Sequence, residues 1–159
     1  MVALELEVGD GAPDFEAKVT DGTSIRLSEI LESGDKVILY FYPRDNTSGC
    51  TVQACDFRDN LGALSGHGWR VIGVSTDNAE SHQKFIEKNA LSFELIVDED
   101  AGLHEKYGTW REKSMYGKTY MGTLRSTFVI NGEGTLEWVG YGVRPKGHVE
   151  TLMEFLKVD

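Results

Sequence analysis

The chain has 159 residues, which suits one compact domain, and the sequence predicts a single domain over residues 1–159. Sixteen basic and 26 acidic residues give a formal net charge of −10, which argues against nucleic acid or an anionic membrane as a partner. The longest apolar run, Val37 to Tyr42, is far too short to span a bilayer.

The first third of the chain alternates between strand and helix patterns. Ser24 to Leu27 is a short strand candidate, and Ser28 stands where it could cap a short helix over 29–31. The run Val37 to Tyr42 is apolar throughout, which is typical of a central strand buried on both faces. Pro43 ends this strand because proline has no amide hydrogen to donate. After a polar loop, Thr51 to Leu64 carries the apolar stripe of a helix.

The rest of the chain continues the alternation, with predicted strands at 70–75, 93–97, 124–130 and 136–141 and predicted helices at 79–89, 101–107 and 148–156. Asp77 or Asn78 is placed to cap the helix over 79–89. Asn131-Gly132 between the last two strands is a strong signal for a β-hairpin. The pattern predicts an α/β fold with a mixed central sheet flanked by helices, an architecture that resembles thioredoxin-like folds.

The cysteines and histidines bear on compartment and metal binding. The chain begins with neither a basic nor an apolar segment, so we expect no secretory signal and a cytoplasmic protein. Its two cysteines, Cys50 and Cys55, are then poor candidates for a permanent structural disulfide. The four histidines are scattered without the spacing of metal ligands, and two cysteines alone make a weak metal site, so we expect no metal.

Cys50 stands at the point where a predicted buried strand and its loop give way to a helix. Open α/β sheets place ligands at this end of their strands. Unpaired amides and the dipole at a helix start favour an anion, which here would be the thiolate, the reactive form of cysteine. The alternative is a buried and inert cysteine, because free cysteine is among the most buried residue types. A core cysteine has no need of a helix start, which counts against that alternative.

Pro43, Thr47 and Cys50 match the motif Pro-x-x-x-Thr-x-x-Cys of peroxiredoxins. The chain further resembles the bacterioferritin-comigratory, or peroxiredoxin Q, subfamily in three segments, which are 40–59, 113–118 and 125–128. The resemblance therefore spans most of the chain. One departure is Ser48, where many members have proline; we expect Ser48 to serve as a capping residue instead.

The resemblance assigns a role to each residue of the motif. Cys50 is implied to be the peroxidatic cysteine, Pro43 to shield its thiolate from water, and Thr47 to hydrogen-bond the thiolate and the peroxide oxygen. Arg125 is implied to supply a second positive field that stabilises the thiolate and the leaving oxygen. In this subfamily the cysteine five positions on is the resolving one, which makes Cys55 the partner of Cys50 in an intramolecular disulfide.

The spacing of the two cysteines has a consequence for motion. Residues five apart in an α-helix have Cα atoms roughly 8 to 9 Å apart, whereas a disulfide tolerates at most about 7 Å. Cys50 and Cys55 therefore cannot bond until the start of their helix unwinds. The alternative is that Cys55 is a small core residue next to the apolar stripe.

The resemblance implies a thiol-dependent peroxidase that reduces hydrogen peroxide and organic hydroperoxides and is recycled by thioredoxin or a related dithiol protein. It implies no cofactor and a monomer or weak homodimer. Two alternatives stay open. A thiol-disulfide oxidoreductase of the thioredoxin type would want Cys-x-x-Cys, whereas four residues separate the cysteines here. A chaperone-like module on the same fold would make no demand on Thr47, Cys50 or Arg125.

Overall fold

The computed structural model describes residues 4–158. Along the chain its elements are β1 (Glu16–Lys18), β2 (Ser24–Arg26), α1 (Leu27–Glu32), β3 (Lys36–Phe41), α2 (Ser48–Gly66), β4 (Trp69–Ser75), α3 (Ala79–Asn89), β5 (Glu94–Val97), α4 (Gly102–Tyr107), β6 (Trp110–Met115), β7 (Lys118–Thr123), β8 (Ser126–Ile130), β9 (Leu136–Tyr141) and α5 (His148–Leu156).

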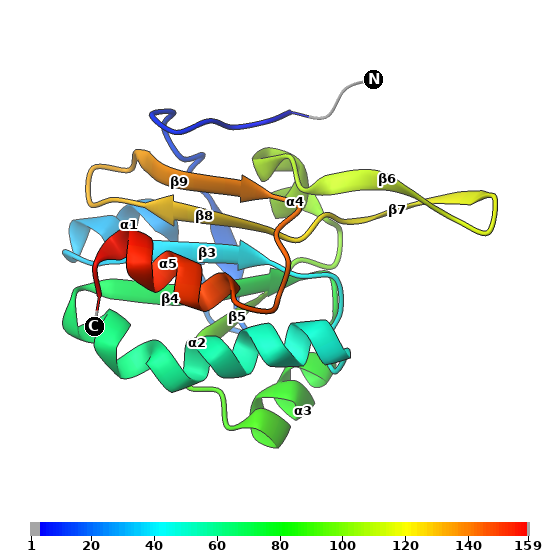
Figure 1. The fold of residues 1–159 in the computed structure, drawn as a ribbon, viewed down its shortest axis with the longest axis horizontal. Helices are drawn as coiled ribbons and strands as arrows, with labels where there is room; N and C mark the ends of the chain where they lie inside the picture. The colour runs from blue at the N-terminus through cyan, green and yellow to red at the C-terminus, as the bar shows by residue number, and fades with distance from the viewer. Residues whose placement is uncertain (1–3, 159) are drawn as a thin grey trace.

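A five-stranded sheet forms the centre of the molecule, in the order β5-β4-β3-β8-β9. β3, β4 and β5 run parallel, while β8 pairs antiparallel with both β3 and β9 (Figure 1). The predicted α/β fold with a mixed central sheet is confirmed. The parallel part arises from strand-helix-strand connections, and the antiparallel part from the hairpin at Asn131-Gly132.

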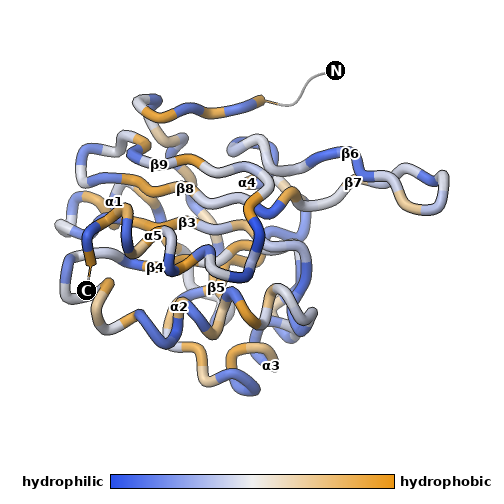
Figure 2. Tube along the Cα trace, in the orientation of Figure 1, coloured by the Kyte–Doolittle hydropathy of each residue, from blue (hydrophilic) through white to orange (hydrophobic). Residues whose placement is uncertain are grey.

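Helices cover both faces of this sheet. Alternate residues of β3 point to opposite faces, so Ile38 and Tyr40 pack with α2, α3 and α5, while Leu39 and Phe41 pack with α1 and α4. In Figure 2 the central strands β3 and β8 are coloured mainly as hydrophobic. None of the helices within residues 4–158 is long and apolar enough to cross a membrane.

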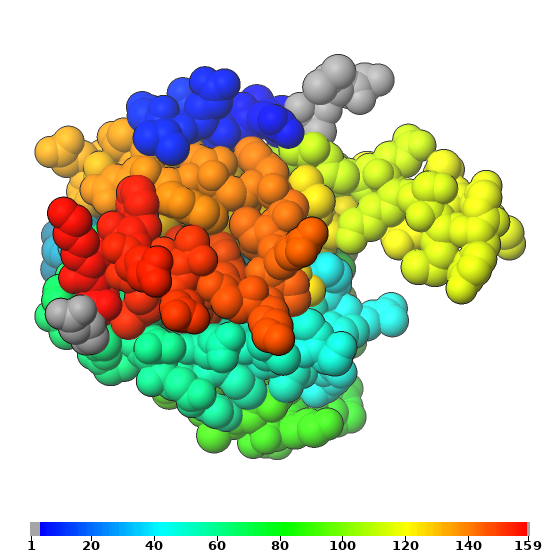
Figure 3. Space-filling view, in the orientation of Figure 1, coloured from blue at the N-terminus to red at the C-terminus, as the bar shows by residue number. Residues whose placement is uncertain are grey.

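Two small two-stranded sheets lie outside the central one, β1–β2 and β6–β7. The β6–β7 hairpin projects from the body of the molecule (Figure 3). Its turn at Tyr116 and Gly117 has φ angles of 52° and 77°, the left-handed pair that a tight hairpin turn requires. The sequence did not predict this hairpin, because most of its residues are partly or fully exposed and do not alternate between apolar and polar.

The start of α2 differs from the prediction. The helix begins at Ser48 rather than at Thr51, so Cys50 is its third residue. Thr47 is the N-cap residue, without a side-chain capping hydrogen bond. The prediction that Ser48 caps this helix is therefore wrong, because the helix already includes Ser48. A longer α2 places the amides of its first turn beside the cysteine.

The caps of α1 and α3 give one correction and one confirmation. Ser28 lies inside α1 and does not cap it, since Arg26 occupies the N-cap position. The carboxylate of Asp14, 14 positions earlier in the chain, pairs with a free amide of the first turn instead, because its Oδ1 accepts a hydrogen bond from the Ser28 amide at 2.9 Å. Asn78 caps α3 as predicted, with its Oδ1 accepting the amide of Ser81 at 2.8 Å.

Candidate active site

The sheet register brings the site together. Phe41 at the end of β3 pairs with Ser126 at the start of the antiparallel strand β8. The loop that follows β3 and the residue that precedes β8, Arg125, therefore meet at one edge of the sheet. α2 begins in that loop, so its third residue, Cys50, comes close to Arg125 although the two are 75 positions apart in the chain.

Cys50 is buried, with 1% of its surface exposed. One of its neighbours is nevertheless a cation, the guanidinium of Arg125. Arg125 donates a hydrogen bond from Nη2 to the Cys50 Sγ at 3.3 Å. The first hydrogen bond within α2 runs from the Thr51 amide to the Thr47 carbonyl at 2.9 Å, so the amides before it have no partner inside the helix. Both features place positive charge, full or partial, beside the Cys50 sulfur.

Gln53 holds Arg125 in this position. Its Oε1 accepts a hydrogen bond from Arg125 Nη1 at 2.7 Å, and its side chain is fully buried. Gln53 follows Cys50 by three residues, so both lie on the same side of α2. Sequence reasoning missed this residue; the spacing from a cysteine at a helix start was the available signal.

The segment before α5 closes over the first turn of α2. A Cβ added to Gly49 would lie 3.1 Å from Pro145 Cγ and 3.3 Å from Arg125 Nη2, which shows how tightly these parts pack. His148, the first residue of α5, faces the Oγ1 of Thr127 at 2.8 Å. Burial, followed by the charge of Arg125, lowers the pKa of His148 to about 4. This histidine is therefore neutral near neutral pH and adds no charge to the site.

The other two motif residues lie in the loop before α2. Thr47 is exposed, and its Oγ1 donates to the Arg44 carbonyl at 2.9 Å; among the described residues it has no hydrogen bond to Cys50. Pro43 is half-buried and lines a cavity of about 530 Å³, together with Lys113 of β6. Burial and the charge of Arg125 lower the pKa of Lys113, while Cys50 acts in the opposite direction. Lys113 is thus a further basic residue on the wall of this cavity.

Cys55 lies farther along α2 and is half-buried. Its Sγ is 3.7 Å from Asn89 Oδ1 at the end of α3, a long contact for a weak thiol donor. Cys50 instead faces Arg125, so the two thiols have different neighbours. Both cysteines are free and belong to one continuous helix. The helix geometry that keeps them apart is therefore present in this structure.

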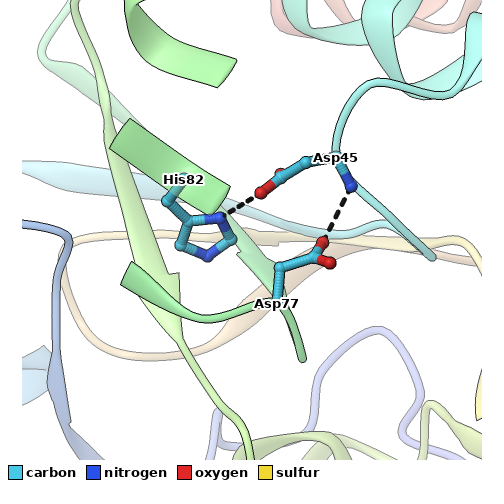
Figure 4. Close-up of side chains that lie close together, drawn as sticks. All are labelled: Asp45, Asp77 and His82. Atoms are coloured by element: carbon cyan, nitrogen blue, oxygen red, sulfur yellow. Dashed lines mark hydrogen bonds and ion pairs between the residues drawn. The ribbon is translucent and has the colours of Figure 1, made fainter. Parts of the chain in front are cut away.

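A polar cluster of Asp45, Asp77 and His82 anchors the loop that precedes α2 (Figure 4). His82 Nδ1 lies 2.7 Å from Asp45 Oδ2, and the Asp45 amide donates to Asp77 Oδ2 at 2.8 Å. The hydroxyl of Tyr42 donates to Asp45 Oδ1 at 2.6 Å, and Ser81 Oγ donates to Oδ2 at 2.8 Å. The loop is thus held to α3 and to the segment between β4 and α3.

The ligand atoms of this cluster lie within 4.8 Å of one another, as a metal site would require. However, the second ring nitrogen of His82, Nε2, lies 2.9 Å from the carbonyl oxygen of Ile96. A carboxylate and a carbonyl only accept hydrogen bonds, so both ring nitrogens carry a hydrogen and His82 is an imidazolium. Burial lowers the pKa of His82, but the hydrogen bond and charge of Asp45 outweigh it and raise the pKa overall. Both ring nitrogens of His82 are thus engaged, so a metal ion would have to displace a hydrogen bond and a proton to reach either of them.

Comparison with known proteins places the chain. The model of the AhpC/TSA family matches residues 8–139. The chain belongs to this family. Peroxiredoxin Bcp of Bacillus subtilis is 44% identical over 156 residues, which cover 97% of this chain and 97% of the relative. A putative peroxiredoxin bcp of Helicobacter pylori is 45% identical and covers 96% and 99%.

Solved structures of AhpC/TSA relatives agree with this assignment. A cysteine-to-serine variant of peroxiredoxin Q from Xylella fastidiosa superposes with a TM-score of 0.90 at 30% identity, covering 98% of each chain. The bacterioferritin comigratory protein of Xanthomonas campestris, described with alkyl peroxide reduction activity, gives 0.84 at 33% identity and covers 90% of each chain. The thioredoxin-like fold and the resemblance to the bacterioferritin-comigratory subfamily are confirmed. The protein is a peroxiredoxin, a thiol-dependent peroxidase.

Proposed function

We propose that Cys50 carries the peroxidase chemistry of this chain. Its thiolate attacks one oxygen of a hydroperoxide, the O–O bond breaks, and the other oxygen leaves as an alcohol, or as water from hydrogen peroxide, after taking up a proton. Cys50 becomes a sulfenic acid in this step. The observation that carries the proposal is the Arg125 Nη2 donor at 3.3 Å from the Cys50 sulfur.

Arg125 has two tasks in this scheme. It stabilises the thiolate before attack, and it faces the negative charge that develops on the leaving oxygen. Gln53 keeps the guanidinium in place through its bond to Nη1 at 2.7 Å. The arrangement requires no metal and no organic cofactor, because the sulfur itself exchanges electrons with the peroxide.

Cys55 resolves the sulfenic acid in this proposal. Its sulfur attacks the Cys50 sulfur, the S–O bond breaks, and water leaves with the proton of the Cys55 thiol. A dithiol protein of the thioredoxin type then reduces the disulfide and becomes oxidised in exchange. Since both cysteines lie in the single helix α2, its first turns must unwind before the new bond forms.

Thr47 and Pro43 complete the scheme as predictions. The Thr47 hydroxyl now donates to Arg44, and a rotation about its side chain would redirect it toward an incoming peroxide. Pro43 would keep bulk water from the sulfur. Hydrogen peroxide and organic hydroperoxides as substrates, a thioredoxin-type reductant, a monomer or weak homodimer and a cytoplasmic location also stay predictions.

Peroxide consumption coupled to thioredoxin, thioredoxin reductase and NADPH tests the proposal. The wild-type protein should oxidise NADPH with either peroxide class, and Cys50→Ser should abolish this, because a hydroxyl is a far poorer nucleophile than a thiolate. Retention of most of the activity by Cys50→Ser would refute the proposal. Reduction of protein disulfides without peroxide turnover would favour the thioredoxin-type alternative, and prevention of aggregation alone would favour the chaperone-like module.

A further inference from the structure

Polar atoms without partners collect around the segment of α2 that must unwind. Among residues 4–158, the buried side-chain nitrogen and oxygen atoms that lack a hydrogen-bond partner are the hydroxyl of Tyr40 and the Nε2 of Gln53. Gln53 lies in the first half of α2 itself, and Tyr40 lies in β3 beneath it. Every other buried polar side chain of the described residues has a partner, so the coincidence with one segment is informative.

Tyr40 packs against α2. Its ring stacks on Phe57 with the centroids 4.7 Å apart, and it is completely buried. Cys50, Ala54 and Phe57 recur along one side of α2 and belong with Tyr40 to the same buried cluster. On the other side the hydroxyl lies against Gly73 of β4, since a Cβ added to this glycine would lie 3.0 Å from the hydroxyl oxygen. The hydroxyl is therefore held in a space that offers it no acceptor.

The phenol keeps its proton in this setting. Burial raises the pKa of Tyr40 well above its usual value, followed by the charge of Cys50, with Cys55 also contributing. Tyr40 is thus a neutral hydrogen-bond donor, and the charge of either sulfur would raise its pKa further. A phenolate is excluded as an explanation of the missing partner.

We propose that Tyr40 is a positioning residue for the disulfide step: its unpaired hydroxyl destabilises the folded start of α2 and so favours the unwound state in which Cys50 reaches Cys55. This inference rests on the proposed function. When residues from Ser48 to Cys55 unwind, Cys50 and Ala54 leave the buried cluster that they share with Tyr40, and water reaches the hydroxyl. The cost of a buried hydroxyl without a partner corresponds to roughly a five- to 150-fold change in an equilibrium constant. That cost disappears in the unwound state, whereas the chemistry at Cys50 does not involve Tyr40.

Tyr40→Phe tests the inference, because it removes the hydroxyl and leaves the stacked ring in place. Disulfide formation after one equivalent of peroxide should slow by about tenfold, within the range expected for one unpaired hydroxyl. At higher peroxide, a larger share of Cys50 should be overoxidised to sulfinic acid, which mass spectrometry detects. The rate of the first reaction with peroxide should stay unchanged. The reduced form should melt at a higher temperature than wild type, and the disulfide form should not.

Tyr107→Phe is the matched control. Tyr107 is also fully buried, but it lies across the sheet, and its hydroxyl donates to the Pro13 carbonyl at 2.7 Å. Its loss should destabilise both redox forms and leave the partition between disulfide and sulfinic acid as in wild type. Equal stabilisation of both redox forms by Tyr40→Phe, or an unchanged partition, would overturn the inference. A reduced Tyr40→Phe protein that melts below wild type would overturn it too, since the hydroxyl would then have a partner.

The wild-type arm separates this inference from the proposed function. If wild-type protein forms no Cys50–Cys55 disulfide with peroxide, the disulfide step is wrong, and the role of Tyr40 is wrong with it. If wild type forms the disulfide and Tyr40→Phe forms it at the same rate, the inference about Tyr40 alone is wrong.

Discussion

Replacement of Arg125 by alanine should slow the reaction of Cys50 with peroxide. The guanidinium donates to the Cys50 sulfur at 3.3 Å, and a hydrogen bond to a charged group contributes about 1.5 to 3 kcal/mol. Because Arg125 is half-buried, solvent screens part of this, and the lower figure applies. About 1.5 kcal/mol corresponds to about a tenfold slower reaction.

The rate of the reaction of Cys50 with hydrogen peroxide, measured by stopped flow in Cys55→Ser protein so that Cys50 is the one remaining thiol, tests this directly. Arg144→Ala is the matched control, because Arg144 is exposed and its loss changes the net charge equally. Arg125→Lys should fall between wild type and Arg125→Ala, since it keeps the charge but loses the fixed geometry. Unchanged peroxide kinetics in Arg125→Ala would refute the reasoning and make Arg125 a structural residue.

Cys55→Ser should consume one equivalent of peroxide and then stall with Cys50 drifting to sulfinic acid; sustained thioredoxin-dependent turnover would show that another thiol resolves it. Oxidation should speed hydrogen exchange at amides 53–59 while β3 stays protected, and equal protection in a proven disulfide form would contradict the helix geometry. Gly49→Ala should slow the reaction with peroxide in stopped-flow, because its Cβ would lie 3.3 Å from Arg125 Nη2; an unchanged rate means that the neighbours yield. His148 has a pKa of about 4 against an ordinary value of 6.5 for histidine, so its contribution to stability is complete above pH 6.5 and is lost as the pH falls toward 4. Over that window wild type should lose up to about 3 kcal/mol more unfolding free energy than His148→Gln in urea titrations, and parallel losses would contradict the assignment.

The central sheet could be predicted from the sequence because its strands have strong local signals. The apolar run at β3 and the turn residues after β8 each specify an element without help from distant residues, although the left-handed residue of that turn is Gly134 rather than Asn131 or Gly132. The β6–β7 hairpin has no such signal, since Tyr116 at its turn adopts a left-handed conformation that non-glycine residues rarely favour. An exposed strand is free to be polar on both faces, and pattern analysis then has nothing to detect.

The site divides in a similar way. The helix start at Cys50 and the resemblance around it pointed to the nucleophile and to Arg125. Gln53 and the Asp45–His82 pair were not found, because their roles depend on partners 72 and 37 positions away. A lone histidine or amide in a sequence does not reveal which distant residue it will meet, and only the fold supplies that partner.

The anchored loop sets a limit on how far the sulfur can travel. The carboxylate of Asp45 contacts three side chains, and its backbone amide donates to the Asp77 carboxylate. Asp45 lies five positions before Cys50. Even a fully extended chain of that length reaches only roughly 17 Å. When α2 unwinds, Cys50 therefore moves on a short chain segment whose other end stays fixed at Asp45. The oxidised sulfur sweeps a small volume in which Cys55 is always at high local concentration. Any reductant must bring its own thiol to that spot, because the disulfide cannot come out to meet it.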